Sequence, residues 1–350
     1  MKKWHVWLAV VVGLAVTVGM MVNDFNFDAL ADIELSARFF LGMMLAAGCF
    51  VAFNLMYSFR FAYLTQHRLS LRKCLRVTVL CEFASAATPS AVGGSGLSFV
   101  YLNREGVSMG RSIFTMFAAL LADETFLAVT SLLGYVLVPA RLLFCTDGGV
   151  AVGGHTAGWV LNSVRAVFLL SVLAVAAWTV VLFVLLLCKP RALGWVLGFC
   201  CRTPWLQRFR PRVEKFADDM VLASTEARRE GTAFWVRLMG YTAGAWSARF
   251  AIVVAILFAF GVQGNLLVAW LRQWGIWMIS IVSPTPGGSG IAELMFRCYY
   301  ADFLPVPSLV VLAAMVWRLF SYYPYLIMGA VALPKWLKQS LLSKQKSMKD

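Results

Sequence analysis

Charged residues are scarce in this chain of 350 residues. Asp, Glu, Lys and Arg together make up 14% of the sequence, whereas hydrophobic residues make up 61% and the mean hydropathy is +0.76. A soluble protein of this length needs far more charge to cover its surface. The shortage of charge therefore excludes a water-soluble fold and indicates an integral membrane protein.

Histidines are few, and the cysteines form no recognisable motif. Only His5, His67 and His155 are present, and their spacing is not that of metal ligands. The eight cysteines include no CxxC pair and lie mostly in or beside apolar stretches, which favours packing over a redox or metal role. We therefore expect no cofactor, no metal and no enzymatic activity, since a membrane-embedded enzyme that acts on lipid phosphates needs a nucleophile or base, and no His or Cys lies in a suggestive motif.

Basic residues, by contrast, exceed acidic ones and give a formal net charge of +14. Such an excess can indicate nucleic-acid binding, but here the basic residues cluster in short segments between apolar stretches. This is the positive-inside pattern of membrane proteins. The predicted partners of these cytoplasmic segments are anionic lipid headgroups, and no nucleic acid is expected.

The apolar stretches are long enough to cross a hydrocarbon core of about 30 Å as helices. Six spans are predicted, at 4–22, 37–58, 112–138, 158–187, 235–260 and 306–332. The first follows Met-Lys-Lys and resembles a signal peptide. Its apolar run is longer than the core of a usual signal peptide, which favours an uncleaved span.

Two further apolar stretches are interrupted by closely similar segments. Residues 88–96 read Thr-Pro-Ser-Ala-Val-Gly-Gly-Ser-Gly, and residues 283–290 read Ser-Pro-Thr-Pro-Gly-Gly-Ser-Gly. Proline and glycine break helices, and broken backbone at membrane depth is tolerated only where it is buried in protein or lines a cavity. A pair of such interruptions, one in each half, is typical of a transporter's binding site.

The distribution of basic residues predicts how these two stretches are placed. The basic segments are 59–76, which includes Arg60 and no acid, 188–237, and the tail 334–350. All three are cytoplasmic only if the stretches 75–100 and 266–300 each enter the membrane and return as a re-entrant helical hairpin. Both termini are then cytoplasmic.

The two interruptions also predict an internal repeat. Gly93 and Gly287 are 194 residues apart (287 − 93 = 194), and adding 194 to the span 112–138 gives 306–332. The sequence therefore predicts an all-α polytopic membrane protein with about six spans and two hairpins in an inverted-topology repeat. The predicted division is a single domain at 1–333, with repeats at about 1–138 and 158–333.

The cytoplasmic segment 188–232 is predicted to lie between the spans of the second half. Within it, residues 211–229 have an amphipathic helical pattern, with Val213, Phe216 and Met220 on one face. This pattern predicts a helix on the inner leaflet, with a solvated linker helix as the alternative.

Each Gly-Gly-Ser-Gly segment is predicted to begin a helix inside the membrane, capped by Ser95 or Ser289. Free N–H groups and the helix dipole at such an end favour an anion, for example a phosphate. The alternative is that the glycines only permit close helix packing.

Ionisable side chains at membrane depth are the second indication of a site, because they are costly there. Such acids and bases form either internal ion pairs or a headgroup site, and Arg318 matches Glu124 in the repeat (124 + 194 = 318). Asp123 and Glu124 point about 100° apart on a helix, so we expect only one of them to face the interior. The full candidate set for a lipid headgroup is Glu82, Pro89, Gly93, Gly94, Ser95, Gly96, Asp123, Glu124, Arg249, Pro284, Pro286, Gly287, Gly288, Ser289, Gly290, Glu293, Arg297 and Arg318.

The segment from Ser283 to Glu293 resembles the PxPGGxGxxE signature of the lysylphosphatidylglycerol synthase transmembrane-region family, also called flippase-like, and residues 88–96 resemble its first-half counterpart. The resemblance covers essentially the whole chain. It implies a bacterial inner-membrane protein that moves a phospholipid or polyprenyl-phosphate lipid between leaflets. Because the chain ends at Asp350, soon after its last span, a soluble aminoacyltransferase domain and lipid aminoacylation are not expected. Where the family usually has Glu-Arg, this chain has Asp123-Glu124, which puts an internal ion pair there in doubt, although Arg318 can compensate.

The sequence thus predicts lipid translocation, with the headgroup held where the two hairpins meet. Two other functions remain open, a secondary transporter of a small soluble anion and a lipid-binding accessory subunit of an envelope-lipid synthase. The expected partners are a membrane phospholipid or isoprenoid lipid, a second copy of the chain, or a separately encoded lipid-modifying enzyme.

Overall fold

The computed structural model describes residues 35–88, 93–144, 157–189, 210–262, 264–283 and 285–347. These residues form helices and connecting turns and contain no strand. The predicted first span, 4–22, lies outside the described residues.

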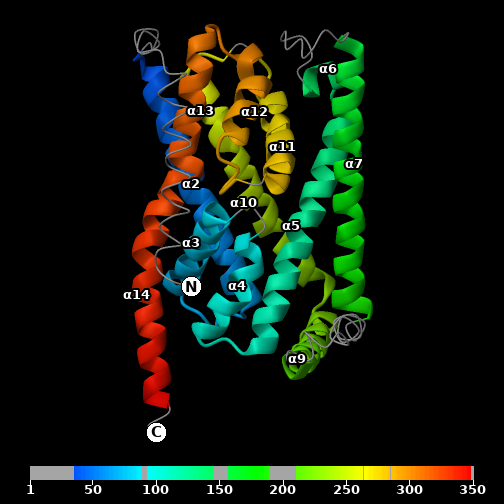
Figure 1. Ribbon diagram of the computed structural model, residues 1–350, viewed down its shortest axis with the longest axis vertical. Helices are drawn as coiled ribbons and strands as arrows, with labels where there is room; N and C mark the ends of the chain where they lie inside the picture. The colour runs from blue at the N-terminus through cyan, green and yellow to red at the C-terminus, as the bar shows by residue number, and fades with distance from the viewer. Residues whose placement is uncertain are drawn as a thin grey trace.

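The helices of the first half are α2 (Ala37–Leu64), α3 (Leu71–Ala87), α4 (Gly93–Arg104) and α5 (Met109–Leu137), followed by the short α6 (Ala140–Leu143). Those of the second half are α7 (Ala157–Phe183), which the π-helix η2 (Val184–Cys188) continues, α9 (Arg210–Arg229), α10 (Thr232–Ala259), α11 (Leu266–Val282), α12 (Ile291–Tyr300), η4 (Ala301–Phe303), α13 (Pro307–Ser321) and α14 (Tyr323–Ser347). In Figure 1 the long helices run along the long axis, with α3 and α4 in the lower half, α11 and α12 in the upper half, and α9 across the lower end.

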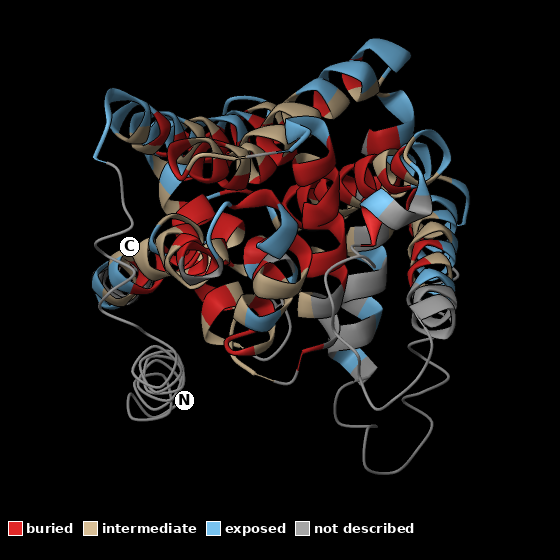
Figure 2. Ribbon diagram, turned by 90° about the horizontal axis from the view of Figure 1, so that it is seen from above, coloured by how far each residue is buried: buried red, intermediate tan, exposed pale blue. Residues whose placement is uncertain are grey.

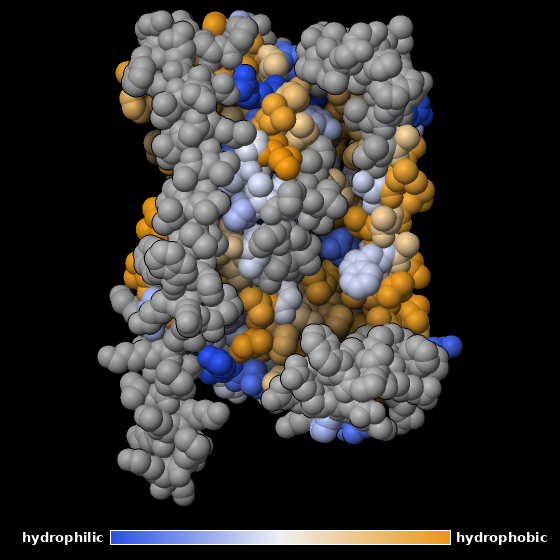
Figure 3. Space-filling view, in the orientation of Figure 1, coloured by the Kyte–Doolittle hydropathy of each residue, from blue (hydrophilic) through white to orange (hydrophobic). Residues whose placement is uncertain are grey.

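Five helical stretches among the described residues are long and apolar enough to cross a membrane. They are Ala37–Leu64, Met109–Leu137, Phe168–Cys188, Thr232–Ala259 and Leu309–Pro334. Buried residues gather at the centre of the bundle, and exposed ones lie around its outside (Figure 2). Many exposed side chains are large and apolar, including Met44, Val136 and Leu137, and hydrophobic colouring dominates the flank that carries α7 (Figure 3). An apolar outer surface is what a bilayer solvates, so the protein is a multi-pass α-helical membrane protein.

The most extensive packing between helices joins α2 to α10. Gly42 makes this close approach possible, because a Cβ atom there would lie 2.5 Å from the Ala259 Cβ. Small residues at such crossings let helix backbones approach closely in membranes. The two helices together form the centre against which the remaining helices pack.

The two halves have matching dimensions. Helices α2 and α10 each have 28 residues and begin 195 residues apart (232 − 37 = 195), and α3 and α11 each have 17 residues and also begin 195 apart (266 − 71 = 195). The outer ends of both short helix pairs carry an arginine–carboxylate contact, Arg76 with Glu105 at 3.3 Å and Arg272 with Asp302 at 2.6 Å. The inverted repeat and its boundaries remain predictions, and these matches support them.

The last predicted span, 306–332, is not a single helix. Helix α13 ends at Ser321 and α14 begins at Tyr323, with Tyr322 between them at φ −131° and ψ −59°. Pro324 explains the break, because it has no N–H to donate and its ring clashes with the carbonyl four residues earlier. The predicted span is confirmed as the apolar stretch Leu309–Pro334, which two helices make up instead of one.

Arg60 does not lie in a loop, as its place in the basic segment 59–76 implied. Helix α2 continues to Leu64, and the Arg60 side chain is 0% exposed. Lys73 and Arg76 belong to α3. The helix extends past the predicted end of its span because Arg60 finds a buried carboxylate partner, described below, which offsets the cost of its charge.

The predicted helix at 211–229 is confirmed as α9, which packs against α5 and η2. Arg228 anchors it by donating to the carbonyls of Leu187 and Cys188 at 2.6 and 2.7 Å, so it satisfies the carboxyl end of η2. Its position on the inner leaflet remains a prediction.

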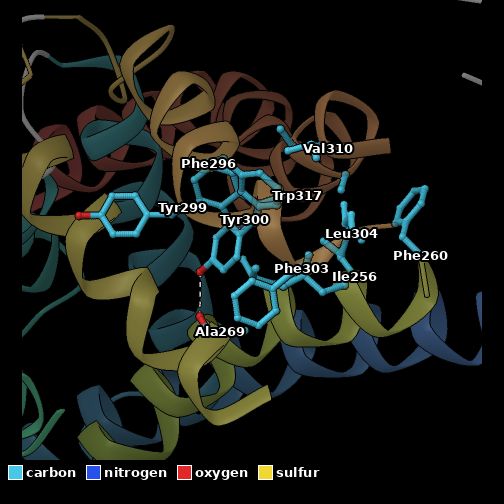
Figure 4. Packing of buried hydrophobic residues seen from close by; sticks show 14 of the residues in the cluster. Ile256, Phe260, Ala269, Phe296, Tyr299, Tyr300, Phe303, Leu304, Val310 and Trp317 are labelled. Carbon is cyan, nitrogen blue, oxygen red and sulfur yellow. Dashed lines mark hydrogen bonds between the residues drawn. The ribbon is translucent and has the colours of Figure 1, made fainter. Parts of the chain in front are cut away.

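An aromatic cluster fixes the upper helix pair against α13 (Figure 4). Phe296 of α12 stacks on Trp317 of α13, with ring centroids 5.3 Å apart. Tyr300 donates its hydroxyl to the Ala269 carbonyl at 2.8 Å, which ties α12 to α11. Aromatic pairs of this geometry stabilise beyond the area they bury. The cluster therefore holds the second interrupted segment in place.

Candidate functional site

A cavity of about 130 Å³ lies where α2, α3, α5, α10, α11, α13 and α14 converge. Its lining includes candidate residues from both halves, namely Glu82, Asp123, Glu124, Arg249, Gly287 and Arg318. The volume is enough for several waters. Charged side chains around a cavity in an otherwise apolar bundle are the expected mark of a functional site in a membrane protein.

The first charged pair in this region joins Arg60 to Asp123. The Arg60 guanidinium bonds both carboxylate oxygens, with Nη2 3.1 Å from Oδ2 and Nη1 closer to Oδ1. Trp246 donates its Nε1–H to the same carboxylate at 2.7 Å, and the side chains of Arg60 and Asp123 are 0% and 9% exposed. The lone pairs of Asp123 are therefore occupied inside the protein, which indicates a structural ion pair.

The second pair joins Arg249 of α10 to Glu82 of α3, with Nη1 2.9 Å from Oε2. The Arg249 guanidinium also lies over the rings of Phe53 and Trp277, at 4.8 and 4.9 Å from their centroids. These two charged side chains line the cavity and are 18% and 11% exposed, more than Arg60 and Asp123. Because one member comes from each half, the pair bridges the halves at the cavity wall.

The third pair joins Arg318 to Glu293 through two parallel hydrogen bonds, Nε to Oε1 at 2.9 Å and Nη2 to Oε2 at 3.1 Å. Arg318 also donates to the carbonyls of Gly287 and Gly288 at 3.2 and 3.3 Å. A bidentate guanidinium–carboxylate pair is among the strongest hydrogen-bonded contacts. The sequence matched Arg318 with Glu124 by position, whereas its partner in the structure is Glu293.

The second Gly-Gly-Ser-Gly segment forms a turn that requires glycine. Gly287, Gly288 and Gly290 have φ of +56°, +69° and +88°, a backbone region that side chains disfavour. Gly290 is the N-cap of α12, and its N–H donates to Glu293 at 2.8 Å. Ser289 instead donates its hydroxyl to the Pro286 carbonyl at 2.8 Å. The prediction that Ser289 caps this helix was wrong, because the Glu293 carboxylate takes that role.

The first segment is only partly described, since residues 89–92, with Pro89, lie outside the described residues. Helix α4 begins at Gly93, two residues before Ser95, so Ser95 does not occupy the N-cap. Gly94 donates its N–H to the Ser85 hydroxyl at 3.1 Å, and a Cβ on it would lie 1.8 Å from the Cys81 carbonyl oxygen. Gly96 has open space instead. At Gly94, therefore, close packing of α3 and α4 explains the glycine.

The two segments contact each other near the middle of the bundle. Gly287 donates its N–H to the Thr88 carbonyl at 3.4 Å, and Tyr322 donates its hydroxyl to the Ala86 carbonyl at 3.4 Å. The carboxyl end of α3 thus touches the turn before α12 and the break before α14. Pro284 lies outside the described residues, and Pro286 belongs to the same turn.

Glu124 differs from the other acids in the cavity. It is half-buried and lines the cavity, yet it makes no hydrogen bond or ion pair within the part of the chain that the structure describes. The expectation that only one of Asp123 and Glu124 faces the interior was wrong, because α5 packs against α2, α10 and α11 and so presents a broad inner face. Arg297 lies one turn beyond Glu293 on α12, outside the cavity lining.

Two polar cavity residues were not identified from sequence. Gln273 of α11 is 4% exposed, and its Nε2 lies near the Tyr300 hydroxyl but makes no hydrogen bond of good geometry to a described residue. The buried hydroxyl of Ser321 in α13 likewise has no partner among the described residues. A single glutamine or serine in an apolar helix has no pattern that separates it from ordinary packing. Within the described ranges, no three His, Cys, Asp or Glu side chains are grouped to hold a metal ion.

The bundle and its charged interior define a class, a multi-pass helical membrane protein with a polar cavity between two similar halves. The family model described as "Lysylphosphatidylglycerol synthase TM region" matches residues 6–329, so the chain belongs to this family. It is also similar to a "UPF0104 membrane protein" of Archaeoglobus fulgidus, with 26% identity over 299 residues that cover 81% of this chain and 83% of the relative. The family resemblance inferred from the interrupted segments is confirmed, and the relative's name assigns no activity or substrate.

Proposed function

We propose that this protein moves a lipid with a phosphate-containing headgroup, a phospholipid or a polyprenyl phosphate, between the leaflets of the bacterial inner membrane. The headgroup passes through the charged cavity while the hydrocarbon chains stay in the bilayer. The observation that carries this proposal is the Arg249–Glu82 pair, which lines the cavity, is partly exposed and bridges the two halves. Family membership supports it, because the family is named for the membrane part of a lipid-modifying enzyme.

The mechanism rests on exchange of partners at Arg249. A guanidinium binds phosphate in the same forked geometry as carboxylate, so an entering headgroup competes with Glu82 for Arg249. The rings of Phe53 and Trp277 hold the guanidinium in position during this exchange. Arg60 and Arg318 are held by more contacts and keep the surrounding helices in place.

The bilayer orientation follows from the basic residues. The lower end in Figure 1, which carries the start of α3, α9 and the end of α14, faces the cytoplasm. The pair α3–α4 then enters from the cytoplasm and the pair α11–α12 from the opposite side, as re-entrant hairpins of oppositely oriented repeats. Rocking of these repeats about the α2–α10 contact opens the cavity to one leaflet and then to the other.

Reconstitution in proteoliposomes tests this function. Wild-type protein is expected to speed the exchange of a fluorescent phospholipid between leaflets, measured by quenching of the outer-leaflet probe. Arg249→Ala is expected to slow this exchange at least about tenfold, because it removes a charge-assisted contact of about 1.5–3 kcal/mol. Arg165→Ala, which removes an exposed arginine from α7 outside the cavity, is the matched control.

Exchange that is equally fast in the Arg249 variant and the wild type rules out the proposed role of Arg249. Uptake of free phosphate without lipid exchange favours a soluble-anion transporter instead.

A further inference from the structure

The charges around the cavity do not balance. Three acids, Glu82, Asp123 and Glu124, and two bases, Arg249 and Arg318, line the cavity, and Arg60 and Glu293 lie behind the lining as partners of Asp123 and Arg318. Each arginine is paired with one carboxylate, Arg60 with Asp123, Arg249 with Glu82 and Arg318 with Glu293. One negative charge is therefore left over, and the unpaired carboxylate is Glu124.

Among the residues that the structure describes, no other side chain at the cavity wall neutralises this carboxylate. The titratable and charged groups that face the cavity with it are Tyr57 of α2, Cys81 and Glu82 of α3, Asp123 of α5, Arg249 of α10, Arg318 of α13, and Tyr322 and Tyr325 of α14, and α11 contributes no titratable group. The two arginines are already committed to Glu82 and Glu293. The neighbouring Asp123 carries the same charge as Glu124 and therefore does not compensate it.

A metal ion is a poor candidate for the missing positive charge. Alkaline-earth ions need six or more oxygen ligands, and zinc needs about four nitrogen, sulfur or carboxylate ligands. The described residues contain no such group of side chains. A single unpaired carboxylate at membrane depth needs only one proton to become neutral, and the neutral form avoids the cost of a buried unpaired charge.

Gln273 gives an independent indication of what then occupies the cavity. Its amide nitrogen Nε2 is buried at the cavity with the Tyr300 hydroxyl as a neighbour, but it makes no hydrogen bond of good geometry to a described residue, although buried donors are nearly always bonded. A protonated Glu124 adds a second donor, its carboxyl O–H. Two donors without acceptors match an oxygen-rich anionic group, whereas an ionised Glu124 repels it.

Resting on the translocation role proposed above, we infer that Glu124 is a proton-binding site of the cavity and that a proton and an anionic lipid headgroup occupy the cavity together. The step is a simple protonation, in which the carboxylate takes one proton from water and becomes a carboxylic acid. Its O–H and the Gln273 N–H then donate to phosphate oxygens of the headgroup. When the headgroup leaves, the proton leaves with it, so lipid movement is linked to proton movement.

The test measures lipid exchange against pH in proteoliposomes that contain an anionic fluorescent phospholipid. In the wild type, exchange is expected to fall as pH rises, approaching about tenfold per pH unit on the alkaline side, as for one required proton. Glu124→Gln resembles the neutral acid in shape and donor capacity, so its exchange is expected to persist with little dependence on pH. Asp218→Asn removes an exposed carboxylate of α9 far along the chain from the cavity residues and is the matched control, with a wild-type pH profile.

Infrared spectroscopy of the purified protein in detergent gives a second readout that does not depend on transport. A carboxylic acid C=O band at neutral pH is expected in the wild type and in Asp218→Asn, and it is expected to be absent from Glu124→Gln. A band that is unchanged in Glu124→Gln, or a Glu124→Gln pH profile parallel to that of the wild type, overturns the proton site. Absence of lipid exchange in the wild type at every pH overturns the translocation role instead, and the infrared band then still decides the proton site.

Discussion

The helix pairs α3–α4 and α11–α12 have similar outlines, yet their carboxylates are held differently. Glu293 of the second pair bonds Arg318 of α13, which belongs to the same half of the chain. Glu82 of the first pair bonds Arg249 of α10, which belongs to the other half. The carboxylate of the second helix pair is therefore bonded within its own half, whereas the carboxylate of the first is bonded across the boundary between the halves.

This difference indicates which contacts a relative movement of the halves can change. Rotation of one half against the other leaves Glu293 and Arg318 together, because both move with the second half. The same rotation alters the distance between Glu82 and Arg249, which also line the cavity. Under the proposed mechanism, the Arg249–Glu82 contact at the cavity wall is therefore the one that is made and broken, whereas the Arg318–Glu293 contact at the α12 turn supports the fold.

Among the variants that test this difference, Arg318→Ala is expected to have the largest effect on the stability of the protein. Arg318→Ala leaves Glu293 and the carbonyls of Gly287 and Gly288 without their shared donor, and breaking a buried ion pair in this way costs about 3–5 kcal/mol. Thermal unfolding in detergent is expected to show a strongly lowered midpoint. Arg249→Ala, measured alongside, is expected to lower it less, because Arg249 makes one hydrogen bond to Glu82, whereas Arg318 makes two to Glu293 and two to backbone carbonyls. If the two variants lower the unfolding midpoint equally, Arg318 is no more important to the fold than Arg249, which contradicts this prediction.

A smaller effect is expected at the glycines of the first pair. Gly94→Ala places a Cβ 1.8 Å from the Cys81 carbonyl oxygen, so α3 and α4 must separate at a cost of about 1–3 kcal/mol. Gly96→Ala is the matched control, since no atom lies within 4 Å of its added Cβ. That variant is expected to be neutral or more stable by up to about 1 kcal/mol, because alanine is the better helix former. Unfolding midpoints in the same detergent measure both, and equal stability of the two variants contradicts close packing at Gly94.

The smallest effects are expected at the ends of the two helix pairs that carry Glu105 and Asp302. There the carboxylate of the first helix pair, Glu105, is the more buried of the two. Glu105 is 7% exposed, bonds Arg76 and accepts the Trp336 N–H at 3.0 Å, whereas Asp302 is 39% exposed. Asp302→Asn is expected to cost less than about 1 kcal/mol, because Asp302 is partly exposed and the buried Arg272 keeps the carbonyls of Leu142 and Tyr299 as acceptors. Glu105→Gln is expected to cost more, about 1–1.5 kcal/mol, because Glu105 itself is less accessible to water than Asp302. Chemical unfolding at low and high salt measures both, and salt is expected to change the Asp302 contribution more.

Much of the architecture could be predicted from the sequence, because the strongest physical constraints on a membrane protein act locally. Apolar stretches of sufficient length must be helical in lipid, and five of the six predicted spans correspond to long helices of the structure. Two segments with Pro and Gly-Gly-Ser-Gly interrupt helices where expected, and the structure brings them into contact through Gly287 and Thr88. Helix lengths and breaks follow from composition, which the sequence displays directly.

Pairing of charges could not be predicted in the same way. The partners of Asp123 and Glu293 depend on which helix faces which, and that depends on packing across the whole bundle. Arg60 was assigned to a basic loop because it stands next to other basic residues, although it is buried against Asp123. Ser289 was assigned as a helix cap from its residue type, but the glutamate three residues into α12 competes for that N–H and binds it. The role of Gln273 had no sequence signal.

The break at Tyr322 has a consequence for how the chain is assembled. Before the break, α13 packs against α10 and α12 of the second half, and after it α14 packs against α3 of the first, with Gly329 directly against the Phe83 ring. The final stretch of the chain therefore completes the first half as well as the second. The two halves are interlaced, so a nascent first half stays unfinished until the last helix has been synthesised and inserted.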